Sequence, residues 1–151
     1  MATRRKARRA ALELLYQVDL CGRFTEAEVN EALDIWRSER ELGEEVLQFV
    51  AQVAHGVREH LQAIDSVIAA YARDWTIERM AVVDRNILRL ALYEMLYRPD
   101  IPASVAINEA VELAKRYGDV GSKAFINGIL AAVKRDLERD QLKGEQVCPP
   151  K

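Results

Sequence analysis

Residues Met80–Tyr97 read MAVVDRNILRLALYEMLY, and the rest of the chain is organised around them. Its apolar residues recur at helical spacing in two adjoining stripes, so the apolar arc is too wide to be covered by one neighbouring helix. The stretch therefore predicts a central helix. It ends before Pro99 and Pro102, because neither proline donates a backbone hydrogen bond and each disfavours helix in the residue before it. The stripes are Val83, Ile87, Leu90 and Ala91, and Leu88, Leu92, Met95 and Leu96.

A narrow polar strip follows the other side of this helix. It consists of Arg85, Asn86, Arg89 and Tyr93, which share a face at spacings of three, four, seven and eight residues. The spacing leaves three alternatives open for these side chains: they face solvent, they pair internally, or they meet a partner.

Helical periodicity continues through the rest of the chain, and no segment alternates as a strand does. The predicted fold is all-α, with about seven helices in two packed helical halves of about 1–74 and 80–140. Residues Asp74–Met80 interrupt the pattern between the halves, and 141–151 is expected to be a mobile tail. The expected helices span about 3–19, 26–36, 43–57, 61–71, 80–97, 104–117 and 122–137, where 61–71 is either a separate helix or a bent continuation of the one before it.

Several positions suggest how these helices begin, end and pack. Thr25 and Glu28 are spaced as in a capping box, and Ser104 is expected to cap the helix after the prolines. Gly118 is expected to end that helix in the left-handed conformation. Gly128 lies inside a helical pattern, where glycine is unfavourable, so it predicts a close approach of another backbone or helix.

Composition indicates a folded intracellular protein. With 151 residues, 50% hydrophobic and 30% charged, the chain fits one domain that buries a core without disulfides or metals. Cys21 and Cys148 are the only cysteines, and Cys148 lies in a polar segment, so we expect no disulfide and a cytoplasmic location. No apolar run approaches the roughly 18 residues that span a membrane.

The positive charge is concentrated at the N-terminus. Residues 1–12 carry Arg4, Arg5, Lys6, Arg8 and Arg9 and no acid, although the whole chain has a formal net charge of -2. Cations in the first turn of a helix oppose the helix dipole. A bound phosphate would satisfy both the cations and the free N–H groups of the helix end, and the alternative is a solvated basic terminus.

Patterns for catalysis or metal binding are weak. His55 and His60 are five residues apart, with no cysteine or paired carboxylate at metal-ligand spacing. The segment Gly118–Gly121 lacks the lysine and the preceding strand of a phosphate-binding loop. We therefore expect no metal site, no cofactor and no enzymatic activity.

Features typical of RNA binding occur at two helix starts. The first helix combines its cations with Tyr16, and the last helix begins with Lys123 and Phe125. Cations supply phosphate contacts, and aromatic rings stack on unpaired bases. The alternative for Tyr16 and Phe125 is packing in the core.

Four motifs, in order, resemble the NusB family of bacterial transcription antitermination factors. The resemblance extends from Arg4 to about Val133, which is most of the chain. The motifs are Arg4–Arg8 with Ala11–Gln17, Val83–Glu94, Val105–Lys115 and Phe125–Leu130.

This resemblance implies an all-helical, non-catalytic RNA-binding protein without a cofactor or metal. Members of the family bind the boxA element of ribosomal RNA leader transcripts, as single-stranded RNA, together with NusE, a small-subunit ribosomal protein. The pair joins other Nus factors on RNA polymerase. By motif, Asp84 and the neighbouring Arg85 would contact NusE. The RNA surface would comprise Arg4, Arg5, Lys6, Arg8, Tyr16, Lys123 and Phe125.

Three positions depart from relatives, and two other readings compete. Arg9 replaces a common acid, whereas Gly121 and Ala124 replace polar or charged residues. One alternative is an RNA-recognition module related to the N-terminal domain of ribosomal RNA cytosine methyltransferases. That reading needs a following cofactor-binding domain, which a sequence ending at Lys151 disfavours. The other alternative is a homodimer whose helix faces mainly serve self-association.

Overall fold

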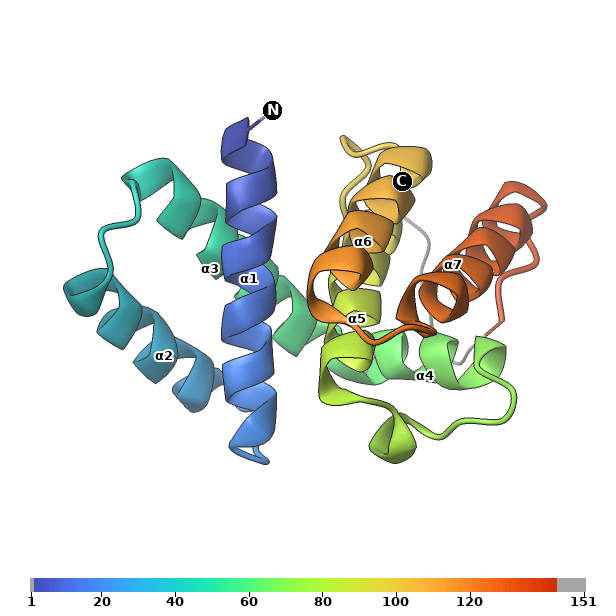
Figure 1. The fold of residues 1–151 in the computed structure, drawn as a ribbon, viewed down its shortest axis with the longest axis horizontal. Coiled ribbons are helices and arrows are strands. Elements are labelled where there is room, and N and C mark those ends of the chain that lie inside the picture. Colours follow the sequence, from blue (N-terminus) through green and yellow to red (C-terminus); the bar gives the residue numbers. More distant parts are fainter. Residues whose placement is uncertain (1, 144–151) are drawn as a thin grey trace. The chain divides into compact units, whose positions relative to one another are not determined.

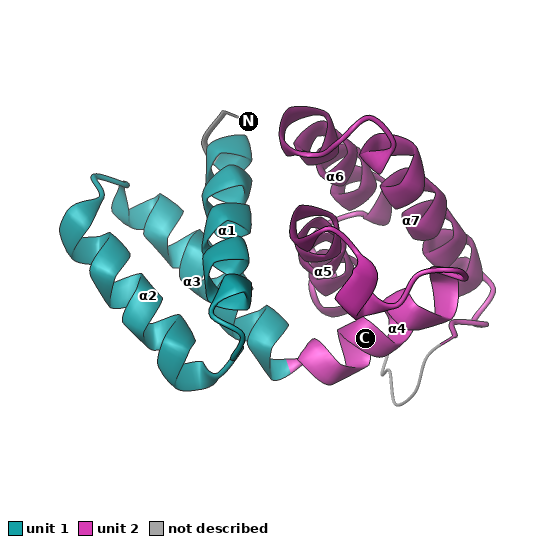
Figure 2. Cartoon of the chain, turned by 60° about the horizontal axis from the view of Figure 1, so that its bottom comes forward, with its two compact units in different colours: residues 1–59 teal, residues 60–151 magenta. Residues whose placement is uncertain are grey.

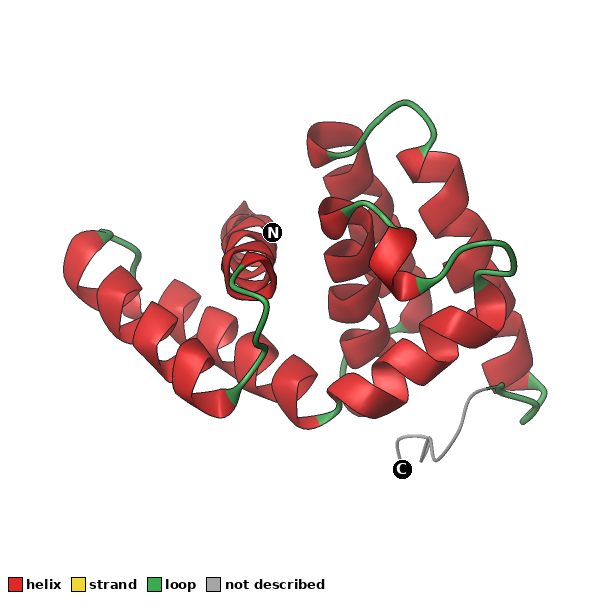
Figure 3. Cartoon of the chain, turned by 90° about the horizontal axis from the view of Figure 1, so that it is seen from below, coloured by secondary structure: helices red, strands yellow, loops and turns green. Residues whose placement is uncertain are grey.

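The computed structural model describes residues 2–143 and their side chains from Arg4 onward. Figure 3 shows helices joined by loops, with no strand in this part of the chain, so the all-α prediction is confirmed. Within residues 2–143, the seven α-helices are α1 (Ala2–Leu20), α2 (Glu26–Glu39), α3 (Glu44–Glu59), α4 (Leu61–Tyr71), α5 (Val82–Tyr97), α6 (Ala103–Tyr117) and α7 (Ser122–Glu138), and a 3₁₀ turn, η1, spans Ile77–Arg79.

The chain divides into two compact units, residues 1–59 and 60–151 (Figure 2). This boundary differs from the predicted break at Asp74–Met80. The reason is that α4 packs against α5, α7 and η1, and buries Ile64, Val67 and Ile68. The loop at 74–80 and its η1 turn therefore lie inside the second unit.

In the first unit, α1 packs mainly on α3, and α2 also packs on α3. The apolar face of α1 is buried, with Leu14 and Leu15 fully enclosed. Trp36 on α2 is buried as well, and its indole Nε1 donates a hydrogen bond of 3.2 Å to Gln17 Oε1. The Arg40 guanidinium lies 3.6 Å from the centroid of the Trp36 ring and pairs with Glu13 at 3.2 Å.

In the second unit, α5 is the central helix and packs against α4, α6 and α7 (Figure 1). Every residue from Asn86 to Leu96 is buried, as the wide apolar arc predicts. The polar strip pairs internally. Arg89 donates two hydrogen bonds of 2.9 Å to the carboxylate of Asp65 and a third, of 3.1 Å, to Asn86 Oδ1. Asn86 Nδ2 in turn donates to the carbonyl of Val82 at 2.9 Å.

Helix ends agree with the sequence at Thr25 and differ at Ser104. The Thr25 hydroxyl accepts from the Glu28 backbone N–H at 3.2 Å, as a capping residue does. Ser104 lies inside α6, which has Pro102 at its N-cap. Pro102 fits this position because its fixed φ suits a helix start and its missing N–H would have no partner there.

Two glycines have different roles from those predicted. Gly118 is extended, with φ -91 and ψ 178, rather than left-handed. It is nevertheless constrained by space, because a Cβ there would lie 2.5 Å from Ser122 Cβ and 2.9 Å from the Ala114 carbonyl oxygen. Gly128 is exposed, and a Cβ added to it would meet nothing within 4 Å, so the predicted close approach is wrong.

The predicted mobile tail is described only at its first residues. The Gln141 N–H donates to the Asp136 carbonyl at 2.8 Å, and the Lys143 N–H donates to the Tyr71 hydroxyl at 3.1 Å. Gln141 is thus hydrogen-bonded to α7, and Lys143 to α4. The remainder of the tail, including Cys148, lies outside the described residues.

Candidate nucleic-acid interface

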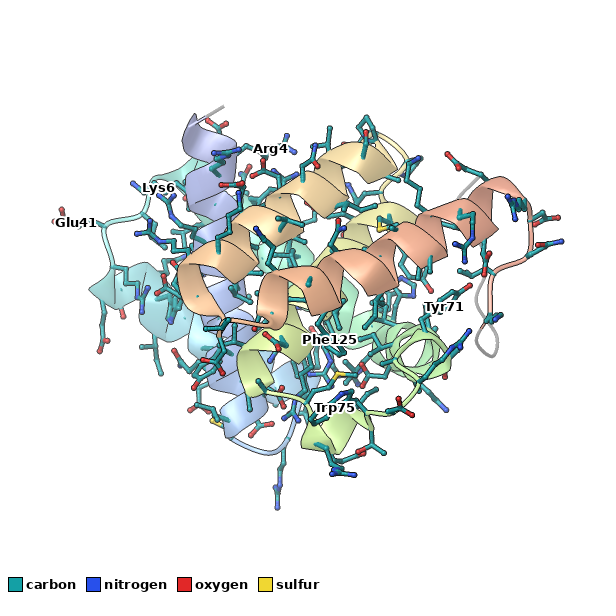
Figure 4. All side chains as sticks on the ribbon, turned by 45° about the vertical axis from the view of Figure 1, so that its right-hand side comes forward. Arg4, Lys6, Glu41, Tyr71, Trp75 and Phe125 are labelled. Atoms are coloured by element: carbon teal, nitrogen blue, oxygen red, sulfur yellow. The ribbon has the colours of Figure 1, made fainter. Side chains whose placement is uncertain are left out.

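The first turns of α1 carry exposed cations. Arg4, Arg5 and Lys6 are exposed, and this turn contains no acidic residue. Figure 4 shows Arg4 and Lys6 projecting to different sides of the helix, as their separation of two residues requires. The backbone N–H groups of a helix N-terminus lack helical acceptors, so cations and N–H groups together form a site suited to a phosphate.

Arg8 differs from its neighbours because it is only 4% exposed. Arg8 and Arg4 are one turn apart, and both guanidinium groups lie over the ring of Phe49 on α3, at 5.8 and 5.3 Å from its centroid. The sequence predicted an RNA contact for Arg8. In the free protein its side chain lies instead within the α1–α3 packing.

Tyr16 lies on the surface of α1 and is 36% exposed, so the core alternative does not apply to it. It is twelve residues from Arg4, which is about 18 Å along the helix axis. A single nucleotide cannot contact both Arg4 and Tyr16. An extended strand of several nucleotides can have its phosphate near Arg4 and a base near Tyr16.

Lys123 and Phe125 occupy the first turn of α7 in the second unit. Lys123 is exposed, whereas Phe125 is half-buried and contributes partly to packing. Ser122, the buried first residue of α7, precedes them. Its Oγ accepts a hydrogen bond from the Asp119 N–H at 2.9 Å. This bond fixes the loop before α7 and therefore the start of the helix that presents Lys123.

Asp84, at the start of α5, is half-buried rather than fully exposed. Burial raises the pKa of its carboxyl group, the nearby negative charge of Asp119 raises it further, and a hydrogen bond from Ser122 opposes both effects. Its Oδ1 is buried without a hydrogen-bond partner among the residues described. A carboxylate in this state carries a free-energy cost in the isolated protein.

The neighbouring Arg85 is also half-buried, and its Nη1 donates to the carbonyl of Ile77 at 3.1 Å. Arg85 thus connects α5 with η1. The structure brings Arg85 and Asp84 together at the start of α5. They belong to the second unit with Lys123 and Phe125, whereas the cations of α1 and Tyr16 belong to the first.

Sequence reasoning missed Phe49 and Ser122 as parts of these sites. Phe49 fits the apolar periodicity of α3, and Ser122 fits a helix start, so each has an ordinary local explanation. Their significance comes from neighbours distant in sequence. The role of Phe49 becomes visible only once α1 packs on α3, and that of Ser122 only once the start of α7 lies beside the start of α5.

Both histidines have partners within the fold. His55 Nδ1 lies 2.6 Å from Glu26 Oε1, and the His60 ring stacks on Tyr97 with centroids 3.7 Å apart. Across residues 2–143, histidine, cysteine and acidic side chains form no group of three or more that could hold a metal ion. None of the helices described is long and apolar enough to cross a membrane.

An all-α fold that exposes Arg4, Arg5 and Lys6 at a helix N-terminus has the electrostatic features of a nucleic-acid-binding protein. The family model of the NusB family matches residues 5–135, and the chain belongs to this family. The resemblance seen in the sequence motifs is thereby confirmed.

Named relatives and solved structures agree with this assignment. Transcription antitermination protein NusB from Bacillus subtilis (strain 168) is 45% identical over 137 residues, which cover 90% of this chain and 98% of that protein. NusB of T. maritima has a TM-score of 0.76 and 36% identity, covering 88% of this chain and 91% of that one. A crystal structure of antitermination factors NusB and NusE in complex with dsRNA matches with a TM-score of 0.75 and 26% identity, over 89% of this chain and 98% of that one.

Proposed function

We propose that this protein is a non-catalytic transcription antitermination factor that binds the boxA element of ribosomal RNA leader transcripts in the cytoplasm. It does so together with NusE, and the pair joins other Nus factors on RNA polymerase. The observation that carries the RNA assignment is the group of exposed cations Arg4, Arg5 and Lys6 at a helix N-terminus without an acid. The named relatives support the antitermination role.

The proposed division of labour follows from the chemistry of each group. Arg4, Arg5 and Lys6 neutralise phosphates, which supplies affinity that does not depend on sequence. Exposed Tyr16 offers a ring for base stacking, and Lys123 with Phe125 supplies a second cation and ring. The roles proposed for these groups are binding contacts and not chemical steps, so the proposed activity is RNA binding and complex assembly. The relatives' names do not favour the methyltransferase alternative.

An RNA titration, with and without NusE, tests this proposal. Fluorescence anisotropy would compare a boxA single strand, a scrambled single strand and a duplex, since one solved relative contains dsRNA. Light scattering beforehand would show whether the protein self-associates. We expect NusE to increase affinity for boxA more than for the other two RNAs. Equal affinity for boxA and scrambled RNA in the presence of NusE would contradict the proposal.

We further propose that Asp84 contacts NusE, with Arg85 beside it as a second contact. Asp84 is half-buried, so part of its carboxylate stays accessible, and a hydrogen-bond donor from a partner would relieve the cost that burial places on its charge. A donor that is a lysine or arginine would also compensate the repulsion from Asp119. The start of α5 thus offers a charged, partly accessible carboxylate whose burial cost binding would offset.

Asp84→Asn is expected to stabilise the free protein and to weaken NusE binding. The raised pKa means that folding disfavours the ionised form, so the cost exists at neutral pH and disappears as the pH falls through this pKa. At pH 7 the free energy of unfolding of the variant should exceed that of the unsubstituted protein by less than about 1 kcal/mol, because half of the Asp84 side chain stays solvated. In acid, where Asp84 is protonated, the two proteins should be equally stable. NusE affinity should fall roughly 5- to 30-fold, since a charged acceptor becomes neutral.

Thermal unfolding across a pH series and calorimetry with NusE measure the two effects. Asparagine keeps an oxygen that can accept from Ser122, so the start of α7 should be preserved. Asp119→Asn is the matched control, because it removes the repulsion on Asp84 but leaves its carboxylate in place. Unchanged NusE affinity in Asp84→Asn would exclude Asp84 from the interface.

A further inference from the structure

We propose that Phe49 is a positioning residue that holds the Arg4 guanidinium at the start of α1 ready for an RNA phosphate. This inference rests on the proposed RNA-binding function, which it extends from the cations of α1 to a residue of α3. The Phe49 ring lies under Arg4 and Arg8, with guanidinium carbons 5.3 and 5.8 Å from its centroid. A guanidinium within about 6 Å of a ring centroid is attracted to the face of the ring.

The packing of α1 on α3 creates this arrangement. Arg4 and Arg8 are one helical turn apart, so they share the face of α1 that meets α3. Like charges at this spacing repel each other, and a ring that attracts both offsets the repulsion. Phe49 itself is 8% exposed, so its position is fixed by the core of the first unit.

The two arginines use the ring differently. Arg8 is buried, whereas Arg4 is exposed and has no hydrogen-bond or ion-pair partner among the described residues. Burial holds Arg8 as part of the packing. Arg4 is therefore the side chain whose orientation depends most on Phe49 and whose N–H donors are available to a phosphate.

An aromatic ring suits this task better than a carboxylate would. A carboxylate fixes an arginine by occupying its N–H donors and neutralising its charge. A ring contacts the face of the guanidinium, so the donors at its edge and the full positive charge remain for the phosphate. Restricting Arg4 before binding also reduces the rotamer entropy that is lost when the complex forms.

Isosteric fluorination of Phe49 tests the inference with little change in shape. Mono-, di- and trifluorophenylalanine at position 49 progressively weaken the negative face of the ring while keeping the core packed. In the free protein, the ¹⁵N order parameter of the Arg4 Nε–H group should fall stepwise, with an unchanged thermal midpoint. The Kd for boxA RNA should rise about two- to fivefold over the series.

Two backgrounds separate positioning from a structural effect. In Arg4→Ala, fluorination should no longer change the RNA affinity, whereas in Lys6→Ala it should keep its full effect, because Lys6 projects to another side of α1 (Figure 4). Phe49→Trp, which retains an aromatic face, should keep Arg4 ordered, and Phe49→Leu should not.

The outcomes distinguish this inference from the proposed function. An order parameter for Arg4 that stays constant over the series overturns the positioning role, whether or not RNA binds. Constant RNA affinity over the series, in a protein that Arg4→Ala weakens, overturns it as well. A protein that binds no RNA refutes the proposed function instead, and the Arg4 order parameter still decides whether Phe49 positions Arg4.

Discussion

Replacing Arg89 with alanine is expected to lower the free energy of unfolding by about 3 to 5 kcal/mol, because it breaks a buried ion pair on one side only. The Arg89 side chain is 6% exposed and meets both carboxylate oxygens of Asp65 at 2.9 Å. Alanine would leave Asp65, which is 23% exposed, without this counter-charge, and would remove the hydrogen bond that Arg89 donates to buried Asn86. Urea unfolding at constant pH measures the loss.

The surface pair Lys134–Glu138 provides the matched control. Its charged atoms are 3.0 Å apart, but the two side chains are 37% and 63% exposed. Lys134→Ala should therefore cost no more than about 0.5 kcal/mol. The double variant Arg89→Met with Asp65→Leu should recover most of the stability lost in Arg89→Ala. A loss below about 1 kcal/mol in Arg89→Ala would mean that this pair behaves as a surface pair.

This ion pair also marks a limit of sequence reasoning. The central place of α5 could be predicted, because two adjoining apolar stripes require several neighbouring helices. The partners of the polar strip could not be predicted, because spacing alone does not reveal which residues face it. The answer depends on Asp65 in α4, 24 residues away. Periodicity identifies a helix face, whereas its partners come from tertiary packing.

The unit boundary and the glycines illustrate the same limit. The segment 74–80 interrupts the periodicity and was predicted to separate the two halves, but the boundary falls at Glu59/His60 because α4 packs against α5 and α7. Gly128 suggested close packing, because glycine is unfavourable inside a helix, but a side chain at this position would face open space. Gly118, by contrast, is constrained by Ser122 and Ala114, and no local pattern announces that contact.

The candidate site was predictable where it depends on charge along one helix. Exposed Arg4, Arg5 and Lys6 follow directly from a basic first turn without acids. The burial of Arg8 and its position over Phe49 result from the packing of α1 on α3, and the raised pKa of Asp84 results from its burial and from the charge of Asp119. Sequence therefore indicates which groups carry charge. Only the fold determines which of them reach solvent and which pay a desolvation cost.

Replacing Arg4, Arg5 and Lys6 together with alanine is expected to weaken boxA binding at least ~10-fold at 0.15 M salt, because charge-assisted phosphate contacts are lost. Arg8 is left unchanged because it is buried, and removing it would disturb the core. If all three cations contact phosphates of a single strand, the slope of log K against log salt should become smaller by about 2, at roughly 0.7 per contact. Titrations at several salt concentrations measure both quantities.

The control replaces three exposed arginines elsewhere, Arg23, Arg37 and Arg73, with alanine. Both triple variants lose three positive charges, so both lower the long-range attraction of the protein for RNA equally at first order. Only the α1 variant removes charges from a helix N-terminus, where the backbone N–H groups also attract phosphate. A large difference in salt slope between the variants therefore locates the contacts on α1. If the two variants lose the same affinity and keep the same slope, RNA binds through general electrostatic attraction, and the first turn of α1 is not its site.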